Sequence, residues 1–190
     1  MRNAYGSNPF PESKVIGDWI NNYTQPEDKI IVACSEPQIL FYAQRASVTG
    51  HIYTYPLVDN GKYMTQLQDE FIGDLKKLPK ISVFTYLGTS WLSRDQTGRV
   101  FKEIEQMHQK NYNLIGVAEA IPTRATNTSP IEWRMNYHWQ KDAISYYNQR
   151  MQGWQQNNAK LQAAGKPTQP PPGLLTIWER KKEISSIESE

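Results

Sequence analysis

The stretch KIIVACSEPQILFYAQR, residues 29–45, decides the predicted fold. Its first half is a short apolar run that is typical of a buried strand. Ser35 and Gln38 then have the spacing of a helix capping box, and Pro37 suits the first turn of a helix, where a missing N–H costs nothing. A strand that turns directly into a helix is half of a βαβ unit.

Outside this stretch, helical and strand patterns alternate along the chain. Helices are predicted at 13–23, 63–78 and 95–110, and further strands at 51–55, 81–87, 112–120 and 174–180. Such alternation favours a parallel sheet covered by helices. We therefore predict an α/β fold, a Rossmann-like three-layer sandwich. Its sheet of about five strands is mostly parallel, and the last two strands pair antiparallel at one edge.

The whole chain, 1–190, is predicted to be a single α/β domain with an insertion before the last strand. The insertion, 121–173, combines a loop, a helix from about 134 to 162 and a Pro-rich return, and a polar tail follows at 183–190. Trp139, Tyr147 and Trp154 recur near helical spacing in the insertion. They either pack on their own domain or form a surface that docks a partner or a membrane.

Composition excludes several classes of function. With 21 basic and 19 acidic residues, the net charge of +2 gives no argument for a nucleic-acid partner. The lone Cys34 lies in an apolar run and is expected to be a small buried hydrophobe. No apolar run reaches the roughly 18 residues of a membrane span, and the first residues lack the apolar core of a signal peptide. We expect this chain itself to be soluble.

No catalytic or cofactor motif is present in the sequence. A Gly-x-Gly-x-x-Gly loop, a Walker lysine loop and a Gly-x-Ser-x-Gly elbow are all absent. His51, His108 and His138 are scattered without metal-ligand spacing. His108, late in a helix, is expected to be either a solvated residue or one favoured by the helix dipole, and not a catalyst. We therefore expect no catalytic residue, metal or cofactor.

Ligands of open α/β sheets bind beyond the carboxyl ends of the strands. Here, that rule predicts a ligand-binding group made of Ser35, Glu36, Arg45, Tyr86, Ser90 and Trp91. Two of these residues have an alternative role. Glu36 either binds a hydroxyl-rich ligand or pairs with Arg45 to hold the turn, and Trp91 is either a platform for a sugar or a buried loop anchor.

Three strings in the first half of the chain carry a resemblance to a known family. They are Val15-x-x-x-Trp19-Ile20, then Thr24-x-Pro26-x-Asp28-Lys29-Ile30-x-Val32, and finally Glu36-Pro37-x-Ile39-x-Phe41-Tyr42-x-x-Arg45. Residues 12–118, together with 174–180, resemble the soluble C-terminal domain of bacterial GT-C type membrane glycosyltransferases, which are dolichyl-phosphate-mannose-protein mannosyltransferase-like. The insertion 121–173 is longer than the hairpin expected of that family.

The resemblance implies a non-catalytic, extracytoplasmic (periplasmic) domain of an enzyme that uses polyprenyl-phosphate sugars. Its partners would be the membrane-embedded part of the same polypeptide and a lipid-linked sugar or glycan acceptor. The family's catalytic acids have no counterpart in this sequence, which leaves a role in acceptor or partner recognition. Two alternatives stay open: a free-standing small-ligand or protein-interaction module, and a soluble enzyme that uses Glu36.

Overall fold

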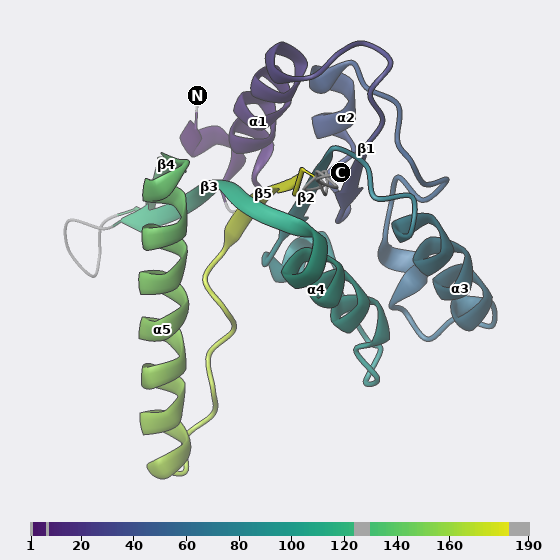
Figure 1. Cartoon of the computed structure of the whole chain (residues 1–190). Helices are drawn as coiled ribbons and strands as arrows, with labels where there is room; N and C mark the ends of the chain where they lie inside the picture. The colour runs from purple at the N-terminus through teal and green to yellow at the C-terminus, as the bar shows by residue number, and fades with distance from the viewer. Residues whose placement is uncertain (1, 7, 124–129, 183–190) are drawn as a thin grey trace, which may run out of the picture.

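A computed structural model describes residues 2–6, 8–123 and 130–182 (Figure 1). The helices are α1 (Phe10–Tyr23), α2 (Gln38–Ala43), α3 (Met64–Leu75), α4 (Arg99–Asn111) and α5 (Lys141–Ala163). The strands are β1 (Ile30–Ala33), β2 (Ile81–Thr85), β3 (Tyr112–Thr123), β4 (Glu132–Trp139) and β5 (Leu174–Arg180). Short 3₁₀ turns, η1 (Arg2–Tyr5), η2 (Tyr55–Leu57) and η3 (Gly88–Ser90), complete the described elements.

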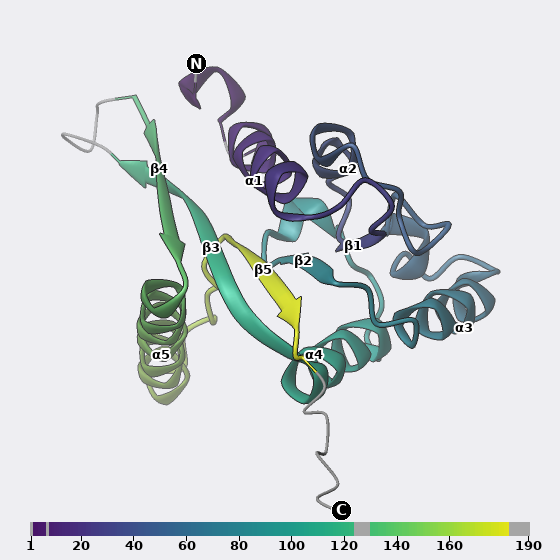
Figure 2. The ribbon, with the colours of Figure 1, turned by 45° about the horizontal axis from the view of Figure 1, so that its top comes forward.

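The five strands form one mixed sheet in the order β1-β2-β5-β3-β4. The pair β1–β2 is parallel, whereas β2–β5, β5–β3 and β3–β4 are antiparallel. It follows that β1, β2 and β3 point the same way, as the alternating pattern predicted. However, β5 returns between β2 and β3 and pairs with both in the opposite direction (Figure 2).

The predicted Rossmann-like three-layer sandwich with a mostly parallel sheet is therefore wrong. The antiparallel pairing of 112–120 with 174–180 is confirmed, but its place at a sheet edge is wrong, because β5 lies inside the sheet. The predicted strand at 51–55 is also absent. Ile52 and Tyr53 are about half exposed there, and the chain enters the η2 turn at Tyr55.

The first residues of the helix predicted at about 134–162 belong instead to a strand, β4. Residues 132–139 pair with β3 in regular antiparallel register, from Thr123 opposite Glu132 to Gly116 opposite Trp139. Gln140, with a positive φ of 56°, then turns the chain into α5. The helical spacing of the aromatic residues concealed the boundary, because hydrogen bonds to β3 decide the state of this segment and local pattern does not. The predicted polar tail 183–190 lies outside the described residues.

The core gathers around the predicted strand at 30–34. All four residues of β1 and all five of β2 are buried, and helix α1 contributes Ile16 and Ile20. Cys34 is fully buried, so its predicted role as a small core hydrophobe is confirmed. Burial raises the pKa of its thiol well above the usual value.

Helix α5 projects from the sheet, as Figures 1 and 2 show. An ion pair between the buried Glu119 of β3 and the exposed Arg150 fixes the first turns of α5 to the sheet. Glu119, 3% exposed, accepts hydrogen bonds from Arg150 Nη2 at 2.5 Å and Nε at 3.0 Å, and from the Tyr146 hydroxyl. Such a bidentate pair constrains the direction of the helix as well as its position.

Candidate functional site

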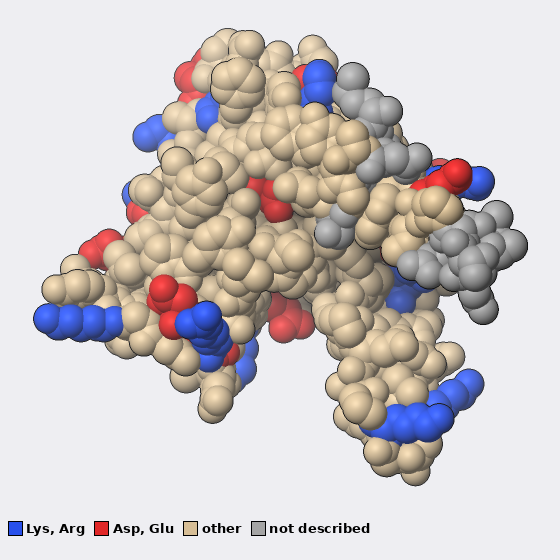
Figure 3. All heavy atoms as spheres, turned by 180° about the vertical axis from the view of Figure 1, so that it is seen from behind, with Lys and Arg blue, Asp and Glu red and all other residues tan. Residues whose placement is uncertain are grey.

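A groove of about 970 Å³ lies between α4, α5 and the β2–β5 part of the sheet. Seven aromatic side chains line it: Phe84, Tyr86, Trp91, Phe101, Tyr147, Trp154 and Trp178. Figure 3 views the molecule from behind and shows the notch that separates the projecting α5 from the rest of the molecule. We call this hollow the aromatic groove.

Polar side chains line the same groove among the aromatic rings. Four of them are amides: Gln109 from α4 and Asn148, Gln152 and Gln155 from α5. An amide side chain can both donate and accept hydrogen bonds. Aromatic faces interleaved with amides suit a ligand that has apolar faces and a rim of hydroxyl groups.

Besides the Glu119–Arg150 ion pair, two contacts hold the groove wall formed by α5. At the base of α5, the Tyr147 hydroxyl lies 2.7 Å from the Tyr86 hydroxyl, next to the end of β2. Farther along, Trp154 Nε1 donates to the carbonyl oxygen of Gln169 at 2.9 Å, and Asn158 donates to the same oxygen at 2.8 Å. The second contact ties the Pro-rich return segment to α5, so Pro170 and Pro171 also line the groove.

His108 and Trp178 form part of the groove lining. Their rings stack with centroids 4.4 Å apart and an interplanar angle of 8°, and His108 Nε2 lies 2.8 Å from Ser82 Oγ. The prediction of a solvated His108 is wrong, because the residue is only 4% exposed. Burial lowers its pKa to about 3, so the ring is neutral at physiological pH.

A second cluster of predicted residues lies at the end of β1, and we call it the polar corner. It joins Ser35, Glu36 and Ser90, all less than 9% exposed. The Ser90 hydroxyl donates to Glu36, and Ser35 N donates to the Ser90 carbonyl oxygen at 3.1 Å. Burial raises the pKa of Glu36, although its hydrogen bonds from Ser90 and Gln38 act in the opposite direction. The corner opens on a small hollow of about 360 Å³.

Arg45 belongs neither to the aromatic groove nor to the polar corner. Its guanidinium donates to Thr24 Oγ1 at 2.8 Å and to the carbonyl oxygens of Asn21 and Thr24 at 2.9 and 2.7 Å. It also donates to the carbonyl oxygens of Ala43 and Gln44. The side chain therefore joins the end of α1 to the end of α2, and the hydrogen bonds described for it include none to Glu36.

The structure redistributes both predicted groups of site residues. Tyr86 and Trp91 from the first group join Tyr147 and Trp154 from the second in the aromatic groove. Trp91 is 4% exposed and donates to the Thr85 carbonyl oxygen at 2.9 Å, as expected of a loop anchor. Trp139 stacks instead on Trp19 of α1, with centroids 4.8 Å apart.

Sequence analysis missed Trp178, Glu105 and the α5 amides as site residues. The apolar residues Phe101 and Ile104 recur at helical spacing within the predicted helix 95–110, and this pattern was the available signal for the α4 wall. No signal pointed to Trp178, because its place beside α4 depends on β5 lying between β2 and β3. The dense Gln and Asn content of 140–162 was visible in the sequence but had no assigned role.

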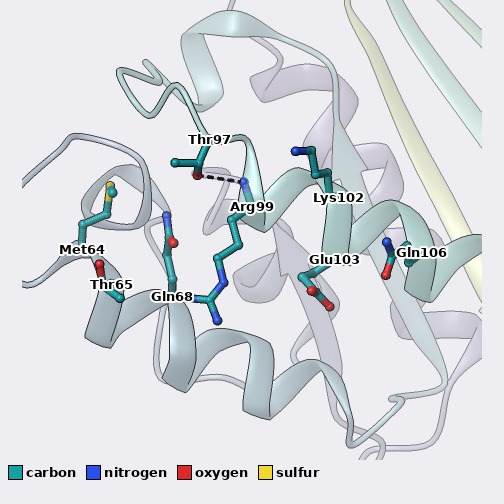
Figure 4. Close-up of a pocket in the computed structure, with 8 residues that line it drawn as sticks. All are labelled: Met64, Thr65, Gln68, Thr97, Arg99, Lys102, Glu103 and Gln106. Carbon is teal, nitrogen blue, oxygen red and sulfur yellow. Dashed lines mark hydrogen bonds between the residues drawn. The ribbon is translucent and has the colours of Figure 1, made fainter.

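A third hollow, of about 440 Å³, lies between α3 and α4 (Figure 4). Its charged side chains are Arg99, Lys102 and Glu103. Arg99 forms an ion pair with Asp69 of α3, with 2.6 Å between Nη2 and Oδ1. Its backbone N–H donates to Thr97 Oγ1 at 3.2 Å. The figure shows the labelled side chains spread along α3, α4 and the loop before α4, and they do not converge on one point.

Comparisons with protein-family models, with curated proteins and with solved structures find no match for this chain. Over residues 2–6, 8–123 and 130–182, no helix is both long and apolar enough to cross a membrane. Within the same described part, no group of three His, Cys, Asp or Glu side chains is placed to hold a metal ion.

Proposed function

We propose that this chain is a non-catalytic, extracytoplasmic (periplasmic) domain of a membrane glycosyltransferase that uses polyprenyl-phosphate sugars. In this proposal, the domain binds the glycan acceptor in the aromatic groove. The resemblance of residues 12–118 and 174–180 to the C-terminal domains of such enzymes supports the assignment to this class. The lining of the groove supports the binding role.

The observation that carries the binding role is the combination of open aromatic rings and amides in one hollow. The C–H face of a pyranose ring is apolar and stacks on an aromatic ring, whereas its hydroxyl groups need donors and acceptors at the rim. Tyr86, Tyr147, Trp154 and Trp178 are each partly exposed in the groove. Asn148 and Gln152 lie beside them. A volume of about 970 Å³ accommodates an oligosaccharide of a few residues.

Calorimetric titration with neutral trisaccharides, such as maltotriose and N-acetylchitotriose, tests the binding role. We expect binding in the micromolar to millimolar range, and we expect Trp154→Ala to weaken it about tenfold, through the loss of about 1.4 kcal/mol. Trp133→Ala is the matched control, because Trp133 of β4 is not among the groove residues. It should leave the affinity unchanged.

The absence of any heat with all saccharides at millimolar concentration would rule out the binding role. Binding of a small apolar compound in place of saccharides would favour the free-standing ligand module instead. Saccharide binding that is equally weakened by Trp133→Ala would move the site away from the groove.

A further inference from the structure

The lining of the aromatic groove carries a negative charge and no positive one among the described residues. Among the described residues of its lining, Glu105 of α4 carries a charge, and no Lys or Arg is present. The imidazole of His108, which also lines the groove, is buried and neutral at physiological pH. The groove therefore has no cation to balance a phosphate or a carboxylate, both of which would need one.

The Glu105 carboxylate influences the two tyrosine hydroxyls at the base of the groove electrostatically. Burial is the main cause that raises the pKa of both Tyr86 and Tyr147. The contact between the two hydroxyls comes next, raising the pKa of Tyr86 and lowering that of Tyr147, and the negative charge of Glu105 adds a smaller upward contribution to each. These are the two hydroxyls whose contact closes the base of the groove. Gln109 Nε2 donates to Glu105 Oε1 at 3.1 Å and holds the carboxylate along the α4 wall.

Several basic residues adjoin lining residues in the sequence without belonging to the lining: Arg94, Lys102 and Lys110. Two others are engaged elsewhere. Arg150 of α5 forms its ion pair with the buried Glu119 of β3. Lys181 Nζ donates to the carbonyl oxygens of Gln109 and Lys110 at the end of α4, each at 3.0 Å. Neither residue belongs to the lining of the groove.

From this arrangement, we infer that the groove selects saccharides by charge: it takes a protonated amino sugar best, a neutral sugar less well, and rejects acidic sugars and phosphates. The groove is then an acceptor site and excludes the phosphate-linked donor, with Glu105 as the residue that decides. This inference rests on the proposed saccharide-binding function.

A matched set of trisaccharides tests the inference by calorimetry with the whole chain at low ionic strength. Chitosan triose carries amines, N-acetylchitotriose has the same backbone without charge, and tri-galacturonate is acidic. We expect the amine form to bind about three- to fivefold more tightly than the neutral form at pH 6, as for an exposed charge pair, and added salt to reduce the difference. Tri-galacturonate and a short-chain polyprenyl phosphate should not compete.

Two variants test whether Glu105 causes the preference for the amine form. Glu105→Gln should equalise the amine and neutral affinities, whereas Glu103→Gln, on the same helix but lining the hollow of Figure 4, should preserve the preference. Equal binding of acidic and amine forms, or an amine preference that survives Glu105→Gln, would overturn the inference while leaving saccharide binding intact. If no trisaccharide binds at all, the proposed function itself fails, and the charge selectivity falls with it.

Discussion

The polar corner and the aromatic groove differ in how their functional groups are used. In the corner, the polar atoms of Ser35, Glu36 and Ser90 are buried and bonded to one another. In the groove, Tyr86, Tyr147 and Trp154 use their polar atoms for internal bonds, but their rings remain partly exposed. The local sequence pattern predicted a ligand site at the corner, yet the groove offers more exposed surface to a ligand.

Packing also differs between the α1–α2 contact and the projecting helix α5, and substitution of a glycine in each gives the largest expected effect. A Cβ at Gly17 of α1 would lie 2.5 Å from Tyr42 Cβ and 3.0 Å from the Ile39 carbonyl oxygen of α2. We expect Gly17→Ala to lower the free energy of unfolding by about 3 kcal/mol, because backbone atoms must move apart. Urea denaturation measures the loss.

Gly153 of α5 supplies the matched control for that substitution. Nothing lies within 4 Å of a Cβ built there, so Gly153→Ala should increase the free energy of unfolding by about 0.5–1 kcal/mol through helix propensity. A similar loss in both variants would contradict the contrast between a tightly packed α1–α2 contact and an open α5.

Acid should affect the two regions in opposite directions. The pKa of His108 falls from 6.5 to about 3 on folding, so the unfolded chain binds a proton that the folded chain does not. Stability is therefore lost as the pH falls below 6.5, by about 2 kcal/mol at pH 5 relative to pH 8. The raised pKa of Glu36 works against this loss, since its folded form retains a proton to higher pH than the unfolded form.

Urea denaturation at pH 8 and pH 5 isolates the histidine contribution when wild type is compared with His108→Gln. The variant should lose about 2 kcal/mol less than wild type over this interval. An identical pH dependence in both proteins would show that His108 titrates freely and is not buried against Trp178.

The smallest expected effects come from two tyrosine hydroxyls, one in each region. Tyr147→Phe removes the half-buried bond to Tyr86 and should cost about 1 kcal/mol of stability. Tyr55→Phe, at the hollow of the polar corner, removes an exposed bond of 3.2 Å to the Thr89 carbonyl oxygen. It should cost a few tenths of a kcal/mol, because water replaces that bond. Thermal unfolding of the two variants would test the order, and a larger effect at Tyr55 would reverse it.

Much of the local structure was predictable from the sequence. The strand at 30–34, the helices around 13–23, 63–78 and 95–110, and the strands at 81–87, 112–120 and 174–180 all have counterparts in the structure. These segments satisfy their own periodicity, and the apolar faces that the pattern marks are the faces that the core buries. The errors fall on 51–55 and on 132–139, where pairing or exposure overrides the local pattern.

The sequence by itself determined most of the helices and strands, apart from 51–55 and 132–139, and also that β1, β2 and β3 run in one direction. Only the tertiary structure decided where β5 inserts, because strand order depends on contacts between residues far apart in the chain. The position of β5 between β2 and β3 places Trp178 against His108. In the same fold, Tyr86 and Tyr147, 61 residues apart in the sequence, come into contact. The aromatic groove exists through these long-range contacts, and no local pattern encodes it.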